Sequence, residues 1–406
     1  MTNIVLKNAT IIDPKSPIHK QIVDIKIQEG TIIEIGKNIA SDNNFIEIME
    51  DNLHVSQGWM DSSVSFGEPG FEDRETIVNG LKVAAKSGFT AVALQPNSFP
   101  VLDNQSQIRF VLDRAKNQAT DMFPIGALTV GSEGIDLAEL FDMKNAGAIA
   151  FGDYNKPICN ANLLKIGLQY AQNFDALILS FPQDNSIASE GLVNEEINST
   201  KLGLKGIPGL AEELQIARDL FILEYTGGKI HIPTISTEKA VKLIKEAKRK
   251  GLKVTCSVSA HHLILTDNEL GSFDSNVKVT PPLRTKNDTK ALLKGLKDGV
   301  IDMITSDHNP IDVEHKKLEF SHAKFGTIGL ESLFGAVNFV LDLETIIKAL
   351  TIHPRAIFNQ EVTSIKKDSI ANLTLFNPDG ISDFLNENIL STSKNSAFLG
   401  KKLKGK

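Results

Sequence analysis

Cysteine is nearly absent from this sequence of 406 residues, which contains only Cys159 and Cys256. Two cysteines so far apart provide neither a disulfide framework nor a zinc knuckle, and they suit a reducing cytoplasm, where we expect the protein to act. Positive charge is also in deficit, because 43 basic residues face 50 acidic ones and give a net charge of −7. This balance argues against general binding to nucleic acid or to anionic membranes. No apolar run approaches the roughly 18 residues of a membrane span.

What the sequence does contain is an alternation of short apolar runs with amphipathic helical stretches. The runs cover residues 58–65, 89–95, 123–130, 148–153, 176–182, 229–236, 252–262 and 301–308. Eight such units predict a (β/α)₈ barrel, whose active site lies at the C-terminal ends of the strands. The stretch STEKAVKLIKEAKRKG is typical of the helices between them, with Ser236 predicted as its N-cap and Gly251 as the residue that follows its last turn.

Both ends of the chain have a different pattern, with strand-like alternation of period two and Gly, Asn or Asp turns. We therefore expect an α/β protein of two parts. Residues 54–365 form the barrel, and residues 1–53 and 366–406 together form a small β-sandwich domain.

A barrel brings the residues at its strand ends into one pocket. These residues are Ser63, Ser65, Asn97, Gly131, Asp153, Phe181, Thr234, His261, His262, Asp307 and His308. A hydrolytic metal site at this place needs imidazoles and carboxylates drawn from several strands. The carboxylates Asp153 and Asp307 are present, but the imidazoles expected at strands one, five and six are missing.

Nine motifs, in this order, make the chain resemble the dihydroorotases of the amidohydrolase superfamily. They are GWMDSSVSFGEPGFED, KSGFTAVALQPNSFPVLDN, AGAIAFGD, GIPGLAEELQIARDL, KIHIPTIST, VTCSVSAHHLILTD, KVTPPLRTKND, GVIDMITSDHNP and FGTIGLES. The resemblance extends from the first strand nearly to the last residue. It implies an amidohydrolase barrel, a role in pyrimidine biosynthesis and, in the family, a zinc-dependent hydrolysis of a cyclic amide.

The chain departs from the family at the residues that carry this chemistry. The first family motif reads roughly D-x-H-x-H-x-R-x-P-G, in which two histidines bind zinc and the arginine binds the substrate carboxylate. Ser63, Ser65 and Gly67 occupy these three places.

The other family histidines are missing as well. Phe181 best matches the strand-five ligand, and no histidine lies between His54 and His231 that could replace it. Thr234 stands at the strand-six ligand, and Ile311 at a second substrate-carboxylate contact.

Three positions keep the residue type of the family. By resemblance these are Asn97 at a substrate-binding position, Asp153 at a metal-ligand position and Asp307 at the position of the catalytic acid/base. A protonated serine or threonine is a poor zinc ligand compared with histidine, cysteine or a carboxylate. We therefore expect no bound zinc and no other cofactor.

The remaining polar residues have structural interpretations. Of His261 and His262, one is expected to pack beneath a loop and the other to hydrogen-bond backbone, and the pair Asp307-His308 is expected to form a hydrogen-bond node. Asp153 is expected to be solvated or paired with a lysine such as Lys156.

Three functions remain open from the sequence. The leading one is an inactive dihydroorotase homologue with a structural or regulatory role, with aspartate carbamoyltransferase as a candidate partner and a homo-oligomer expected. The second is a hydrolase with an altered metal site, which would use Asp153, Asp307 and His261 or His262. The third is a small-molecule binding protein that uses the old pocket.

Overall fold

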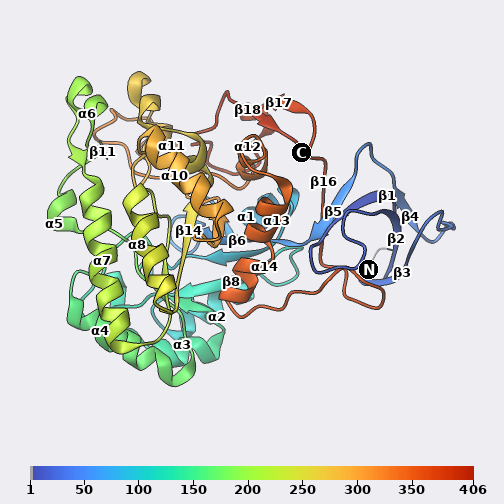
Figure 1. Cartoon of the computed structure of the whole chain (residues 1–406), viewed down its shortest axis with the longest axis horizontal. Coiled ribbons are helices and arrows are strands. Elements are labelled where there is room, and N and C mark those ends of the chain that lie inside the picture. The colour runs from blue at the N-terminus through green and yellow to red at the C-terminus, as the bar shows by residue number, and fades with distance from the viewer. Residues whose placement is uncertain (1–2) are drawn as a thin grey trace.

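Eight parallel strands form the centre of the computed structural model, which describes residues 3–406 (Figure 1). They are β6 (Trp59–Val64), β7 (Phe89–Leu94), β8 (Asp121–Gly126), β9 (Ala150–Phe151), β10 (Ile178–Leu179), β13 (Ile230–Ile232), β14 (Val254–Ser259) and β15 (Met303–Thr305). Neighbours along the chain pair in this order from β6 to β15. The first and last strands then meet, because the Ser65 N–H donates to the His308 carbonyl at 2.7 Å. The sheet is therefore a closed barrel, and the predicted (β/α)₈ fold is confirmed.

A helix follows every strand and covers the outside of the barrel. The main helices are α1 (Ile77–Lys86), α2 (Gln105–Arg114), α3 (Leu140–Ala146), α4 (Ala161–Ala171), α7 (Gly209–Thr226), α8 (Glu238–Arg249), α10 (Lys286–Lys297) and α13 (Leu343–Leu350). The shorter helices are α5 (Asn185–Ala188), α6 (Ile197–Leu202), α9 (Ala260–Ile264), α11 (Val313–Lys316), α12 (Leu333–Val337) and α14 (Ile352–Ile357). None of the helices described in residues 3–406 combines the length and apolar character needed to cross a membrane.

Helix α8 shows how the sequence pattern becomes structure. Val241 and Ile244 face the barrel, at the spacing of one helix face. The N-cap is Thr237, whose hydroxyl accepts from the Ala240 N–H at 3.2 Å. The prediction of Ser236 was therefore wrong by one residue, because the Ser236 hydroxyl donates instead to the buried carboxylate of Glu212.

The strands are shorter than the apolar runs that predicted them. Strand β14 ends at Ser259, and the last three residues of its predicted run, 260–262, belong instead to helix α9 (Ala260–Ile264). The Ser259 hydroxyl caps this helix by accepting from the His262 N–H at 3.4 Å. Apolar character continues past the strand because the inside of the barrel mouth is buried as well.

The N-terminal residues form a separate sheet at the right of Figure 1. Its strands are β1 (Ile4–Ile12), β2 (Ile22–Gln28), β3 (Thr31–Gly36), β4 (Ile46–Ile48), β5 (His54–Gln57) and β16 (Leu373–Phe376). Strand β16 comes from the C-terminal part of the chain and pairs antiparallel with β5. The apolar core of this six-stranded sheet contains Leu6, Ile11, Ile25 and Val55.

Residues after β16 leave this sheet. Strands β17 (Ile381–Asp383) and β18 (Lys402–Lys404) pair with each other, and β18 lies against α12 of the barrel. Leu403, Phe398 and Phe384 are buried in one cluster with barrel residues such as Leu265 and Ala336. The division of the chain into two parts at residues 53/54 and 365/366 stays a prediction.

Two further strands, β11 (Val193–Asn194) and β12 (Gly206–Ile207), form a short parallel pair between β10 and α7.

One tryptophan connects the barrel to the terminal sheet. The ring of Trp59 on β6 lies 5.4 Å from that of Phe376 on β16 and 4.9 Å from that of Phe334 on α12. Its indole N–H donates to the Ser56 hydroxyl at 2.9 Å, so the buried polar atom is satisfied. Aromatic rings in such contacts stabilise beyond their buried area.

We expect Trp59→Ala to lower the free energy of unfolding by roughly 3–5 kcal/mol, because it opens a cavity where the two parts meet. Urea denaturation followed by circular dichroism measures this loss. The exposed Phe99, of which 71% is accessible to solvent, provides the control. Equal losses for Trp59→Ala and Phe99→Ala would contradict the assigned role.

Candidate functional site at the barrel mouth

A network of hydroxyl, amide and carboxyl groups occupies the centre of the barrel mouth. The Ser63 hydroxyl at the end of β6 lies 3.4 Å from Asp307 Oδ1 and donates to it. Gln95 Nε2, after β7, donates to the Ser63 hydroxyl at 3.1 Å. The Tyr154 hydroxyl, after β9, donates to Asp307 Oδ1 at 3.3 Å. Four strand ends thus contribute to one connected cluster, as a barrel requires.

A second pair lies beside this cluster. Asn97 Nδ2 donates to the Ser65 hydroxyl at 2.8 Å, and Ser65 is buried. The two serines that stand at the expected ligand positions of β6 therefore both bond amide side chains from the loop after β7. In this arrangement they act as hydrogen-bond partners within the protein.

Asp61 is buried below the cluster and connects the first strand to the last. Its carboxylate accepts from the Ser63 N–H at 3.0 Å, from the Thr305 hydroxyl at 2.5 Å and from the Ser306 N–H at 3.0 Å. Burial raises the pKa of Asp61, and hydrogen bonds from Ser63, Thr305 and Ser306 oppose the rise. Asp61 therefore holds β6 and β15 together from inside the barrel.

Both carboxylate oxygens of Asp153, which follows β9, are already engaged in hydrogen bonds with the loop after β8. Its Oδ1 accepts from the N–H groups of Leu128 and Thr129 at 2.9 and 3.1 Å, and its Oδ2 accepts from the Thr129 hydroxyl at 2.5 Å. Burial raises its pKa, and these hydrogen bonds lower it. No ion pair within 4 Å joins it to Lys156 in the described residues, although that lysine's charge also lowers the pKa. Asp153 thus fixes the loop after β8.

The space that remains at the mouth is small. Ser63, Tyr154, Thr234 and Asp307 are among the residues around a cavity of about 10 Å³, which is room for about one water molecule. Phe181 is buried, with only 2% of its surface accessible. Leu179, Pro233 and several polar groups line the region.

Thr234 and Asp307 keep an unusual backbone at their strand ends. Both have φ of +46°, in the left-handed region that costs non-glycine residues of order 1–3 kcal/mol. Such conformations gather at active sites, where the surrounding structure imposes them. The backbone of the mouth is therefore that of a functional site, although its side chains are not those of a metal site.

Of the buried histidines at the mouth, His262 bonds through both ring nitrogens and His308 through one, whereas His261 Nε2 has no hydrogen-bond partner among the described residues. His262 bonds the Ser259 hydroxyl at 2.6 Å through Nδ1 and the Pro281 carbonyl at 3.0 Å through Nε2. His308 accepts backbone N–H groups of residues 329 and 330 at its Nδ1. Burial lowers the pKa of His262 to about 4 and that of His308 to about 3, so both rings are neutral. The ring of His261 lies 4.6 Å from that of His262, and burial lowers its pKa well below the ordinary value.

These contacts leave no set of metal ligands. Within residues 3–406, no group of three or more His, Cys, Asp or Glu side chains is placed so that it could hold a metal ion. Zinc sites need three or four such ligands around one point. The side chains of the mouth therefore do not fit the zinc that related barrels use.

Comparisons with known proteins show to which family the chain belongs. Residues 54–240 match the family model described as dihydro-orotase-like. The dihydroorotase of Geotalea daltonii is 37% identical over 99% of this chain and 96% of its own length, and that of Ruminiclostridium cellulolyticum is 40% identical over 99% and 95%. The chain belongs to the dihydroorotase family. Among solved structures, an L-hydantoinase from Arthrobacter aurescens has a TM-score of 0.86 at 20% identity, covering 100% of this chain and 93% of the hydantoinase, which shows the shared fold.

Of the predicted strand-end residues, Ser63, Thr234 and Asp307 lie around one cavity in this dihydroorotase homologue, but sequence reasoning missed three residues of the same cluster. Asp61, Gln95 and Tyr154 lie in the cluster, and none had been identified as a site residue. Gln95 and Tyr154 stand two residues before Asn97 and one after Asp153, so proximity to predicted site residues was the available signal. The roles assigned to Asn97, Asp153 and Asp307 by resemblance stay predictions.

Asp307 should make the stability of this homologue depend on pH. Burial raises the pKa of its carboxyl to about 7, and the charge of Asp61 adds to the rise. An unfolded aspartate has a pKa near 3.9. Between about pH 4 and 7 the folded protein therefore keeps a proton that the unfolded chain releases, so stability falls as pH rises through this window. We expect Asp307→Asn to reduce this slope by at most ~1.4 kcal/mol per pH unit, measured by urea denaturation at pH 5, 6, 7 and 8.

Asparagine is the appropriate replacement because it tolerates a positive φ. The exposed Asp51 supplies a charge-matched control as Asp51→Asn. If the slopes of the wild type and of Asp307→Asn coincide, the buried carboxyl does not hold the proton.

Proposed function

We propose that this member of the dihydroorotase family has no catalytic activity and acts as a structural or regulatory partner in pyrimidine biosynthesis. One observation carries the proposal. The hydroxyls at the ligand positions Ser63 and Ser65 are bonded to neighbouring side chains, and the mouth has room for about one water molecule. A dihydroorotase needs a metal centre and a bound substrate at this place. The mouth of this chain offers neither the ligands for the metal nor the space for the substrate.

The substrate side supports the same proposal. Gly67 stands where the family has its carboxylate-binding arginine, and a Cβ built there would lie 1.7 Å from the Phe71 carbonyl oxygen. Any side chain at this position requires the loop to move. Ile311, at the second carboxylate contact, is buried and apolar. An anionic substrate therefore lacks both of its expected partners.

No specific observation favours the two alternative functions. A hydrolase with an altered metal site would use Asp153, Asp307 and His261 or His262. Asp153 and His262 are held by other hydrogen bonds, and although His261 Nε2 has no partner, no three such side chains within residues 3–406 are placed around a common point. A binder of metabolites in the old pocket would need far more than about 10 Å³, since ligand pockets measure about 300–1,000 Å³.

We expect the purified protein to contain far less than one equivalent of zinc. It should neither cyclise carbamoyl aspartate nor open dihydroorotate above the rate of a buffer control. The dihydroorotase of Geotalea daltonii serves as the positive control in the same assay. Elemental analysis and the assay before and after chelation measure these outcomes. One equivalent of zinc, with turnover lost on chelation, would overturn the proposal.

Restoring one ligand should not restore activity. We expect Ser63→His to remain inactive with added zinc, because the other ligands and the substrate contacts are still missing. Circular dichroism shows whether the variant is folded. A folded variant that turns over dihydroorotate would show that the mouth is closer to a working site than we propose.

A partner role predicts a specific complex. We expect the tagged chain to co-purify with aspartate carbamoyltransferase from its native cell, at a fixed ratio measured by light scattering. The double variant of an unrelated surface, Lys15→Glu with Lys37→Glu, provides a control for non-specific capture through exposed charges. Recovery of the chain with no enzyme of pyrimidine synthesis would count against this partner.

A further inference from the structure

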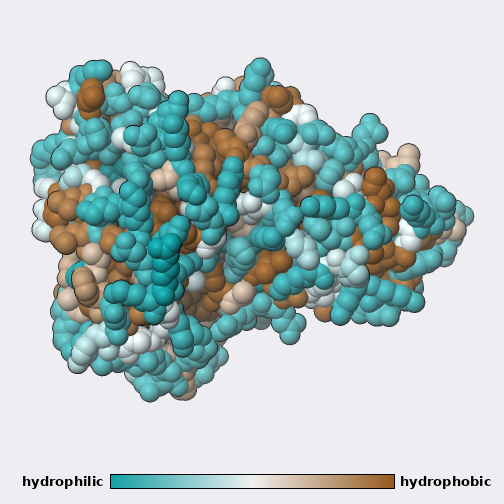
Figure 2. All heavy atoms as spheres, viewed as in Figure 1, coloured by the Kyte–Doolittle hydropathy of each residue, from teal (hydrophilic) through white to brown (hydrophobic). Residues whose placement is uncertain are grey.

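Helix α7 has apolar side chains on the face that it turns away from the barrel. Its 18 residues cover about 27 Å. Four large apolar residues along it are exposed: Leu210 (52%), Leu214 (46%), Phe221 (71%) and Tyr225 (79%). At 3.6 residues per turn, these four lie within about 60° of the helix circumference. Figure 2 shows apolar residues gathered at the left of the molecule, where Figure 1 labels α7.

These four positions are arranged symmetrically along the helix. Leu210 and Tyr225 are equally far from the midpoint of α7 between Ala217 and Arg218, and so are Leu214 and Phe221. A two-fold axis across this midpoint would bring the helix against an antiparallel copy of itself. Leu210 would then meet Tyr225 of the partner subunit, and Leu214 would meet Phe221 of the partner subunit. A partner of another sequence would not require this symmetry, whereas an isologous dimer does.

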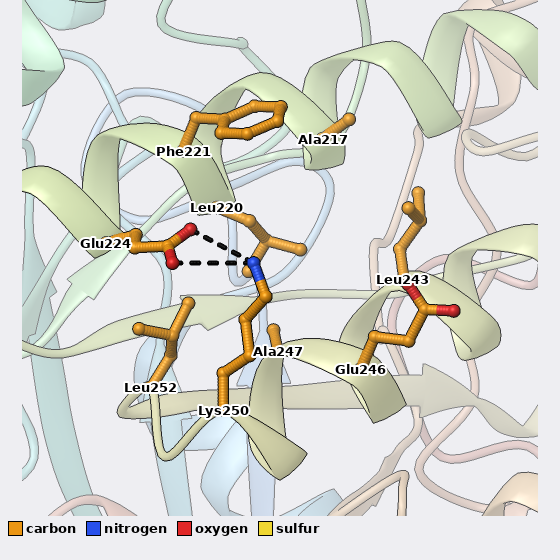
Figure 3. A pocket seen from close by; sticks show the side chains of 9 residues that line it. All are labelled: Ala217, Leu220, Phe221, Glu224, Leu243, Glu246, Ala247, Lys250 and Leu252. Carbon is orange, nitrogen blue, oxygen red and sulfur yellow. Dashed lines mark hydrogen bonds and ion pairs between the residues drawn. The ribbon is translucent and has the colours of Figure 1, made fainter.

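A shallow hollow beside the stripe adds a place for a side chain. It measures about 100 Å³ and lies between α7 and α8, with Leu220, Phe221, Leu243 and Leu252 in its lining (Figure 3). In the antiparallel arrangement, Leu214 of the partner subunit lies opposite Phe221, at the edge of this hollow.

The charges around the stripe are already balanced. Glu213 pairs with Lys239 at 3.1 Å and Glu224 with Lys250 at 3.2 Å, one pair toward each end of α7. The two-fold axis places each of these pairs near the other pair of the partner subunit, so positive and negative groups alternate at the rim. Arg218, nearest the axis, is neutralised by the buried Asp219 at 2.7 Å.

The exposed apolar stripe supplies part of the area that a stable dimer needs, and neighbouring residues supply more. Aromatic side chains bury about 150–250 Å² each, so the stripe supplies a few hundred Å² per subunit. Ile166 and Tyr170 of the adjacent helix α4 are also partly exposed and extend the apolar face. A standard interface buries about 800 Å² per partner.

We propose that α7 is the two-fold interface of a homodimer, in which it packs antiparallel against α7 of a second copy. The inference does not depend on whether the barrel is catalytic.

The first test is the mass of the full chain in solution. We expect light scattering at tens of micromolar to give twice 44.3 kDa. The double variant Leu214→Glu/Phe221→Glu should give the monomer mass with an unchanged circular dichroism spectrum. Ile46→Glu, in the terminal sheet and also exposed (57%), is the control and should stay dimeric. A monomeric wild type, or a dimer unaffected by the double variant, overturns the proposal.

The second test reads the register and does not depend on weakening the dimer. Cys159 is first replaced by serine, because it is exposed. We expect a mixture of the Leu214→Cys and Phe221→Cys proteins to form a disulfide-linked dimer on mild oxidation. Each variant alone should not, because seven residues separate the two cysteines by about 10 Å along the axes, beyond the roughly 7 Å that a disulfide can bridge. No cross-link in the mixture, or an equal one in a single variant, excludes the antiparallel register.

Discussion

The buried carboxylate of Asp61 is the interaction on which the barrel mouth depends. It accepts hydrogen bonds from Thr305 and Ser306 on the last strand while it belongs to the first. Parallel strands at the ends of a sheet have unpaired backbone groups, and a barrel satisfies them by closing. Asp61 reinforces this closure from inside and positions Ser63. It also places a negative charge near Asp307, which contributes to the high pKa of that carboxyl.

The rest of the mouth has the character of a protein core. Among the described residues Gln95 Oε1, Asn97 Oδ1 and Thr234 Oγ1 are buried without a partner, but other hydroxyl and amide groups bond one another where a metal centre would need outward-facing ligands, as the Ser65 hydroxyl and Asn97 Nδ2 do. Because an unpaired buried polar group costs about 1–3 kcal/mol, such mutual bonding stabilises the barrel. The left-handed backbone conformation of Thr234 and Asp307 lowers the stability of the folded state, and the surrounding fold imposes it. The chain shares the overall fold of the hydantoinase, while its mouth has serine, phenylalanine and threonine at positions 63, 65, 181 and 234.

Sequence reasoning identified the barrel well because the alternation of apolar runs and helical stretches has a direct physical cause. It also predicted that polar residues would gather at one end of the barrel, because the residues after the strands must meet there. It was less accurate at element ends. Ser236 has the chemistry of a helix cap, but Glu212, far away in the sequence, takes its hydroxyl and leaves the cap to Thr237. Asp61, Gln95 and Tyr154 could not be assigned, because their partners come from other strands.

By itself the sequence determined the eightfold repeat, the family resemblance and the absence of histidine at four ligand positions, since each of these depends only on residue types and their order. Only the tertiary structure decided that Asp153 bonds the loop after β8, that a side chain at position 67 would strike a carbonyl, and that the apolar residues of α7 face outward. These outcomes depend on distances between residues that are remote in the chain. Residue type limits what a side chain can bond, but the fold decides what lies within its reach.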